Sequence, residues 1–170
     1  MDTTAPLPFH SGFLTSEEPA LRYSQLIRLV NEVTERAVAD EIASTTGLKA
    51  TATSNFIGRY MMLGPIAARL AVDLDLWSRF ATSPIWLTFF GFDFKGDGRD
   101  IRPLLQNVAR LAAEPSRTNA SQCEAVPLFV PDGTEWHDVV DSVYGQLYDI
   151  QACFRDLPPP AVAVQPPPDL

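Results

Sequence analysis

Apolar residues recur at helical spacing in two long segments, one near each end of the chain. In residues 15–42 the apolar stripe consists of Leu26, Leu29, Val30, Val33, Ala37 and Val38. In residues 132–157 it consists of Trp136, Val139, Val140, Val143, Leu147, Ile150 and Phe154, after a capping-box pattern formed by Asp132 and Glu135. Because residues three and four apart share one face of a helix, both segments are predicted to be amphipathic helices.

Four segments between these helices have the patterns of β-strands, namely residues 55–64, 68–77, 85–92 and 125–131. The second alternates between apolar and other side chains, and Gly64-Pro65 joins it to the first, which predicts an antiparallel hairpin. The third, "IWLTFFGF", is apolar on both faces and is therefore predicted to lie centrally in a sheet. The prolines of the fourth, "AVPLFVP", predict a position at the sheet edge.

The order of these elements predicts the fold class. A short helical turn is predicted in residues 75–83, and a third main helix follows Asp100. The result is an α+β fold, with a mainly antiparallel sheet of about four strands packed by three main helices. Residues 1–14 are predicted to be a flexible lead-in, 15–157 a single α+β domain and 158–170 a Pro-rich mobile tail.

Composition and charge narrow the classes of function. Of 170 residues, 46% are hydrophobic and 20% charged, which is typical of a globular domain. The net charge of −8 repels phosphate backbones, so no broad nucleic-acid surface is expected. The two cysteines, and the lack of a signal-peptide or membrane-spanning pattern, predict a cytoplasmic protein with no membrane partner.

One catalytic hypothesis comes from the acidic residues near the strand ends. Nucleases of the PD-(D/E)xK type hold Mg²⁺ with an acid on one strand and with an (Asp/Glu)-x-Lys sequence on the next, whose lysine helps to activate water. Asp75 (or Asp73) and the sequence "DFK", with Asp93 and Lys95, have this order. Asp75 and Asp93 would then be the metal ligands, and Mg²⁺ the only cofactor. The competing reading is a strand end and turn, because acid-x-Lys triplets are common and "KGDGRD" has turn composition.

Two further features suggest other functions. Aromatic residues cluster around the third strand, and alternation places Phe90, Phe92 and Phe94 on one face. If that face is uncovered, these rings and Trp77 form an apolar patch suited to a protein partner. A nucleophile pair made by Cys123 or Cys153 with His137 is a weaker alternative, since no neighbouring residue in the sequence orients it.

A set of turn and packing residues resembles a pattern found in uncharacterised bacterial domains, some with nuclease-like or defence-related labels. The matching residues are Gly58, Tyr60, Asp75, Trp77, Ser83, Pro84, Trp86 and Leu87. The resemblance covers roughly residues 20–155 and implies no catalytic set. Taken together, the sequence predicts a non-enzymatic module that binds a protein or a ligand, as an accessory or regulator in bacterial defence. Its predicted partner is another protein, or a second copy in a homo-oligomer.

Overall fold

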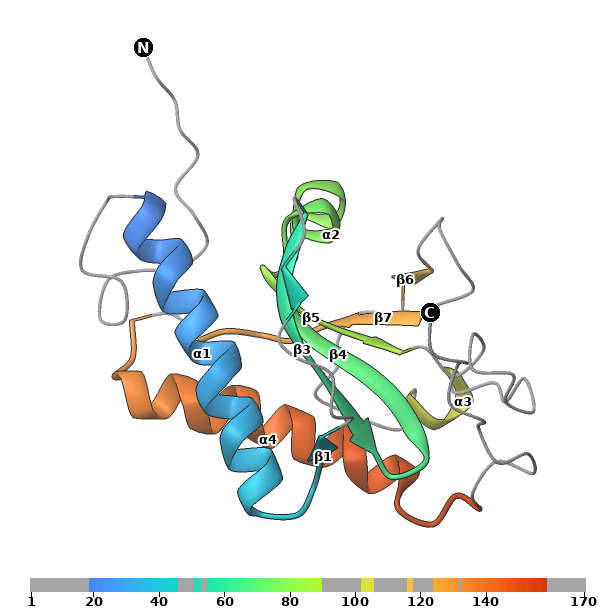
Figure 1. Cartoon of the computed structure of the whole chain (residues 1–170). Coiled ribbons are helices and arrows are strands. Elements are labelled where there is room, and N and C mark those ends of the chain that lie inside the picture. Colours follow the sequence, from blue (N-terminus) through green and yellow to red (C-terminus); the bar gives the residue numbers. More distant parts are fainter. Residues whose placement is uncertain are drawn as a thin grey trace, which may run out of the picture.

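An antiparallel sheet with two long helices on one face forms the centre of the molecule (Figure 1). The computed structural model describes residues 19–45, 51–52, 55–89, 102–105, 116–117, 124–131 and 133–158. The strands of four or more residues are β3 (Phe56–Leu63), β4 (Ile66–Asp73), β5 (Ile85–Phe89) and β7 (Glu124–Pro127). The helices are α1 (Pro19–Ala39), α2 (Leu74–Phe80), α3 (Arg102–Leu105) and α4 (Trp136–Phe154). The predicted α+β fold with about four antiparallel strands is therefore confirmed.

The sheet order is β1-β3-β4-β5-β7-β6, and β2 also pairs with β3. Its three shortest strands have two residues each: β1 (Ser44–Thr45), β2 (Thr51–Ala52) and β6 (Ser116–Arg117). The predicted hairpin is β3–β4, and it turns at Gly64 with φ of 59°. A Cβ atom at Gly64 would lie 3.0 Å from the carbonyl oxygen of Phe154, so glycine also allows the turn to pack against α4.

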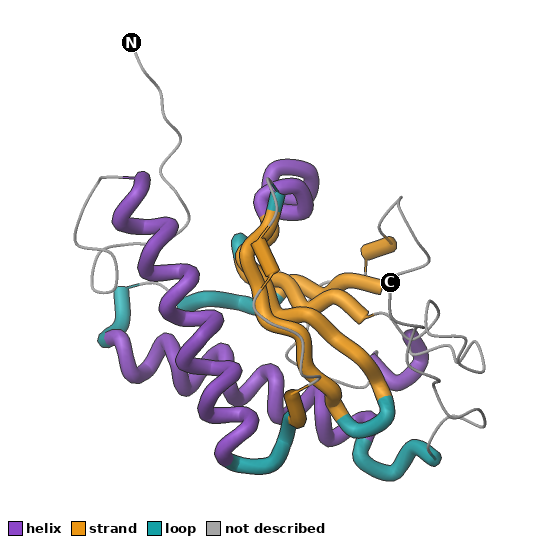
Figure 2. The backbone as a smooth tube through the Cα atoms, viewed as in Figure 1, coloured by secondary structure: helices purple, strands orange, loops and turns teal. Residues whose placement is uncertain are grey.

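The strand alternation separates two buried faces of the sheet. Ile85, Leu87 and Phe89 of β5 point to the face that α1 and α4 cover, whereas Trp86 packs on the opposite face with Leu76 and Ala125. Both long helices lie on the same side of the sheet (Figure 2). All five residues of β5 are buried, and β5 lies between β4 and β7, so the predicted central position is confirmed.

The predicted strand 68–77 is wrong at its end. Strand β4 stops at Asp73, because this residue caps α2: its Oδ1 atom accepts a hydrogen bond of 3.0 Å from the Leu76 backbone N–H. The Leu-Asp alternation that continues to Trp77 therefore belongs to a helix of seven residues. Asp73 and Asp75 consequently do not share one face of a strand.

Two other predicted boundaries also differ from the structure. Helix α4 begins at Trp136 with Glu135 as its N-cap, so the predicted start at Asp132 is too early. Strand β7 ends at Pro127, and beyond it the Gln146 side chain replaces a neighbouring strand: it accepts from Phe129 N–H (2.8 Å) and donates to Phe129 C=O (2.7 Å). In the sheet, β7 lies between β5 and the short strand β6. The predicted position of this strand at the sheet edge is therefore wrong.

Candidate functional site

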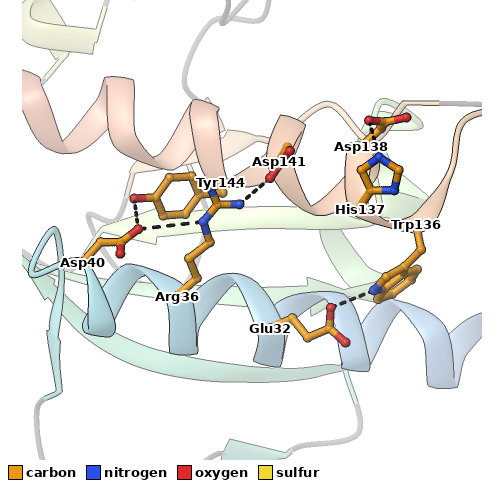
Figure 3. A network of polar contacts seen from close by, with 8 residues as sticks. All are labelled: Glu32, Arg36, Asp40, Trp136, His137, Asp138, Asp141 and Tyr144. Carbon is orange, nitrogen blue, oxygen red and sulfur yellow. Dashed lines mark hydrogen bonds and ion pairs between the residues drawn. The ribbon is translucent and has the colours of Figure 1, made fainter.

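Side chains of α1 and α4 meet in a row of polar and aromatic contacts on the outside of the molecule, here called the α1–α4 seam (Figure 3). Its first cluster consists of Arg28, Glu32 and Trp136. The Arg28 guanidinium lies 4.6 Å from the centre of the Trp136 ring and donates a hydrogen bond of 2.6 Å to Glu32. The indole N–H of Trp136 donates to the other oxygen of Glu32 at 2.7 Å. The Glu32 carboxylate thus binds both Arg28 and Trp136, and the Arg28 guanidinium stacks on the Trp136 ring.

The second cluster repeats this arrangement with Arg36, Asp40 and Tyr144. The Arg36 guanidinium lies 4.0 Å from the Tyr144 ring centre, and the Tyr144 hydroxyl donates to Asp40 at 2.6 Å. Arg36 also forms ion pairs with Asp40, at 3.8 Å, and with Asp141 of α4. Arg36 lies eight residues after Arg28 on α1, and Tyr144 lies eight residues after Trp136 on α4. A step along α1 thus matches an equal step, in the same sense, along α4. The two helices must therefore run in the same general direction.

The seam changes the titration of two of its members. The hydrogen bond to Asp141 raises the pKa of Arg36 above its ordinary value. Burial raises the pKa of Tyr144, and its hydrogen bond to the Asp40 carboxylate raises it further. Both shifts favour the protonated forms that make the contacts, so the two groups of the second cluster keep their protons to higher pH than free side chains would.

A third ring continues the row along α4. Tyr148 is 42% exposed, and the Arg155 guanidinium lies 6.0 Å from its ring centre. Tyr148 and Arg155 take no part in the contacts between α1 and α4 that define the two clusters. The row of rings on α4 is thus Trp136, Tyr144 and Tyr148, each with an arginine beside it.

The prediction from sequence missed the seam, although the sequence contains a signal for it. Arg28, Glu32 and Arg36 of α1 and Asp40 just after its end follow one another at intervals of four, and α4 has aromatic residues at positions 136 and 144. Four-residue spacing explains the ion pairs among these residues. It does not reveal that residues about a hundred positions later contact the same side chains, because that contact depends on how the two helices pack.

A buried ion pair lies on the opposite face of the sheet. Arg69 donates to Asp73 at 3.1 Å, and its guanidinium lies 3.6 Å from the centre of the Phe56 ring. The arginine reaches along β4 past Ala71, which pairs with Gly58. A Cβ atom at Gly58 would lie only 2.5 Å from the Ala71 Cβ, so the two small residues fit closely together under this side chain.

The structure answers part of the nuclease hypothesis. Both oxygens of Asp73 are occupied, Oδ1 by the Leu76 N–H and Oδ2 by Arg69. Asp75 lies on the exposed first turn of α2 and pairs with Arg79 at 3.4 Å. Asp93 and Lys95 lie outside the described residues, so the convergence of Asp75 with them stays a prediction. Within the described ranges, no group of three His, Cys, Asp or Glu residues could hold a metal ion.

The predicted aromatic patch is also only partly described. Trp77 is half-buried and packs against the main core, whereas Phe90, Phe92 and Phe94 lie outside the described residues. Phe129, which is 63% exposed, was not among the predicted interaction residues. Two hydrogen bonds fix its backbone: the Phe129 N–H donates to Gln146, and the Gln146 amide donates to the Phe129 carbonyl oxygen.

A nucleophile pair between Cys153 and His137 is excluded by helix geometry. The two residues lie in the same helix, sixteen positions apart. At 1.5 Å of rise per residue, their backbones are separated by roughly 24 Å. Burial also raises the pKa of the Cys153 thiol, and the nearby Asp149 adds to this shift, so the thiolate is disfavoured. Cys123 lies outside the described residues.

The sequence matches no protein-family model, and searches of curated proteins and solved structures likewise find no match. The implied relation to bacterial defence proteins therefore stays a prediction. In the part of the chain that the structure describes, no helix is both long and apolar enough to cross a membrane.

Proposed function

We propose that this chain is a non-enzymatic cytoplasmic module that binds another protein through its α1–α4 seam. The observation that carries the proposal is the row of ring and guanidinium pairs along that seam. Tryptophan, tyrosine and arginine dominate the binding energy of protein interfaces, because each combines a large contact area with a polar group. Here three rings of α4 each have an arginine beside them, supplied by α1 for Trp136 and Tyr144 and by the C-terminal end of α4 for Tyr148.

The fixed arrangement of these side chains supports the proposal further. An exposed arginine normally loses rotational freedom when a partner immobilises it, and this loss weakens binding. Arg28 and Arg36 are already held between a ring and a carboxylate. A seam prepared in this way loses less entropy on binding than free side chains would.

The charge of the chain favours a different protein over a second copy as the partner. The net charge is −8, so two copies repel each other as they approach. Acidic residues also outnumber arginines along α1, α4 and their flanking residues. A partner with a complementary, basic surface is therefore favoured.

Affinity capture from the source cells tests the proposal, with two matched arginine variants. Arg28→Ala removes an exposed arginine that pairs with a carboxylate four residues away and lies near a ring on the seam. Arg79→Ala removes an arginine with the same kinds of neighbours, Asp75 and Phe80, on α2. The wild type and Arg79→Ala should retain the same protein in stoichiometric amount, and Arg28→Ala should retain at least about tenfold less, as expected for a hot-spot residue.

Thermal unfolding of each variant shows whether a loss of capture reflects a loss of folding. Tyr148→Ala gives a second test, because this ring adds contact area without joining α1 to α4. Equal recovery by the seam variants and by Arg79→Ala would contradict the proposal, and so would the absence of any stoichiometric partner. A Mg²⁺-dependent nuclease with Asp75, Asp93 and Lys95 remains the alternative, and no contact among the described residues favours it.

A further inference from the structure

An open pocket lies where the C-terminal ends of α1 and α4 meet the β3–β4 turn and β1. Figure 1 shows these elements together at the lower end of the sheet. The pocket has a volume of about 460 Å³, within the range of sites that hold small molecules. Its lining consists of Val38, Glu41, Ile42, Ala43, Ser44, Met62, Gly64 and Gln151. None of these residues belongs to the seam clusters.

The lining combines an apolar floor with a few polar groups. Val38, Ile42 and Met62 provide the aliphatic and thioether surface. Glu41 and Ser44, which are both exposed to solvent, provide a carboxylate and a hydroxyl group. Gln151 is only 8% exposed, and its Oε1 atom accepts a bond of 3.4 Å from Arg155. An apolar body with one polar group would therefore match the lining.

The backbone fixes the position of Glu41. This residue has φ of 59°, a left-handed conformation that usually favours glycine or asparagine at the end of a helix. Hydrogen bonds hold the turn closed, from Glu41 N–H to Val38 C=O at 3.2 Å and from Ile42 N–H to Ala37 C=O at 3.0 Å. The single carboxylate of the lining is thus attached to a fixed turn.

The electrostatics of the pocket favour a positive charge. The C-terminal end of a helix carries a partial negative charge, and both α1 and α4 place their last turns at the pocket. The Glu41 carboxylate adds a full negative charge. Arg36 is neutralised by its ion pairs with Asp40 and Asp141. Arg155 keeps its positive charge at the end of α4, where it donates to Gln151, so the negative charge at the pocket comes mainly from Glu41 and from the end of α1.

We propose that this pocket binds a small organic cation, a protonated amine on a compact apolar body. The amine would lie against the Glu41 carboxylate and the helix ends, and the apolar body against Val38, Ile42 and Met62. This inference is independent of the α1–α4 seam, and neither proposal needs the other.

Titration with benzylamine at neutral pH, followed by backbone amide NMR, tests the proposal. Benzyl alcohol and benzoate are the neutral and anionic counterparts of similar shape. Benzylamine should shift the amide signals of pocket residues such as Glu41, Ser44 and Met62 in a saturable manner. The other two compounds should give shifts at least about tenfold weaker at equal concentration, as expected when a charge-assisted contact is lost.

Two variants locate the binding site. Glu41→Gln keeps the size of the side chain and should weaken benzylamine binding about fivefold or more, whereas Glu35→Gln makes the same charge change on the exposed side of α1 and should leave it unchanged. Ser44→Phe should weaken binding by filling the pocket while the Glu41 charge remains. Equal binding by wild type and Glu41→Gln would overturn the proposal, as would shifts spread over the surface or equal binding of benzyl alcohol.

Discussion

At the scale of single residues, burial separates two aspartate–arginine pairs that look alike in the sequence. Arg69 and Asp73 are four residues apart, as are Asp75 and Arg79. The side chains of the first pair are 11% and 6% exposed, and those of Arg79 and Asp75 are 38% and 54% exposed. Water screens the second pair, so losing one of its charges should cost little. Losing one charge of the first pair should cost much more, because the other charge would stay buried without a partner.

We therefore expect Asp73→Asn to lower the free energy of unfolding by about 3 kcal/mol, because the buried Arg69 loses the facing carboxylate charge. Asparagine can still accept the cap bond from Leu76 N–H, so this change tests the charge and not the cap. The matched change Asp75→Asn should cost less than about 1 kcal/mol. Urea unfolding measures both, and similar costs for the two variants would contradict the distinction.

The same residues show where the sequence was sufficient and where it was not. The alternation of Leu70 and Val72 correctly predicted a strand, but it continues through Leu74 into the helix that Asp73 caps. An aspartate in an alternating segment can be an outward-facing strand residue or a helix cap. Only its hydrogen bond to Leu76 N–H distinguishes the two, and the sequence does not contain that information.

At the scale of elements, the α1–α4 seam should respond to alkaline pH through Tyr144. Its pKa in the folded protein is raised by burial and by the bond to Asp40, so the folded state binds the phenolic proton more tightly than the unfolded state does. This contribution is fully present below the ordinary tyrosine pKa of about 10 and is lost as the pH rises through the higher folded value.

Wild-type protein should therefore lose stability more steeply above about pH 10 than Tyr144→Phe, which has no proton to lose at this site. Urea unfolding midpoints at a series of pH values measure the difference. Tyr23→Phe removes a phenol of α1 that lies outside the two seam clusters, and it controls for a general loss of tyrosine ionisation. A decline for Tyr144→Phe as steep as that of the wild type would show that the folded state does not bind the Tyr144 proton more tightly than the unfolded state does.

The main elements were predictable from their apolar patterns. The two long helices follow from apolar residues at helical spacing, and the central strand β5 follows from a run that is apolar on both faces. The seam did not follow, since Trp136 and Glu32 are 104 positions apart and meet only after both helices have packed on the sheet. Periodicity identifies the face of a helix that is buried, whereas the neighbours of the half-exposed residues at its border depend on helix packing.

At the scale of the whole molecule, the hydrophobic core indicates which part of the chain is needed for folding. Among the described residues, the main core cluster extends from Leu26 to Phe154, with Leu157 packed against it. All of these positions fall within the predicted domain, residues 15–157. We therefore expect a chain of residues 15–157 to unfold cooperatively in urea, with a free energy within about 0.5 kcal/mol of the full chain.

A chain that ends earlier, within α4, gives the contrasting case. Ending the chain at Gln146 removes Leu147, Ile150 and Phe154, each with a fully buried side chain in the core. Losing one such residue typically costs about 2–5 kcal/mol, so losing all three should cost about as much as the whole stability of a domain of this size. This chain should therefore lack a cooperative unfolding transition. If residues 15–157 also lacked one, segments beyond the core cluster would be required for folding, and the domain would extend past those limits.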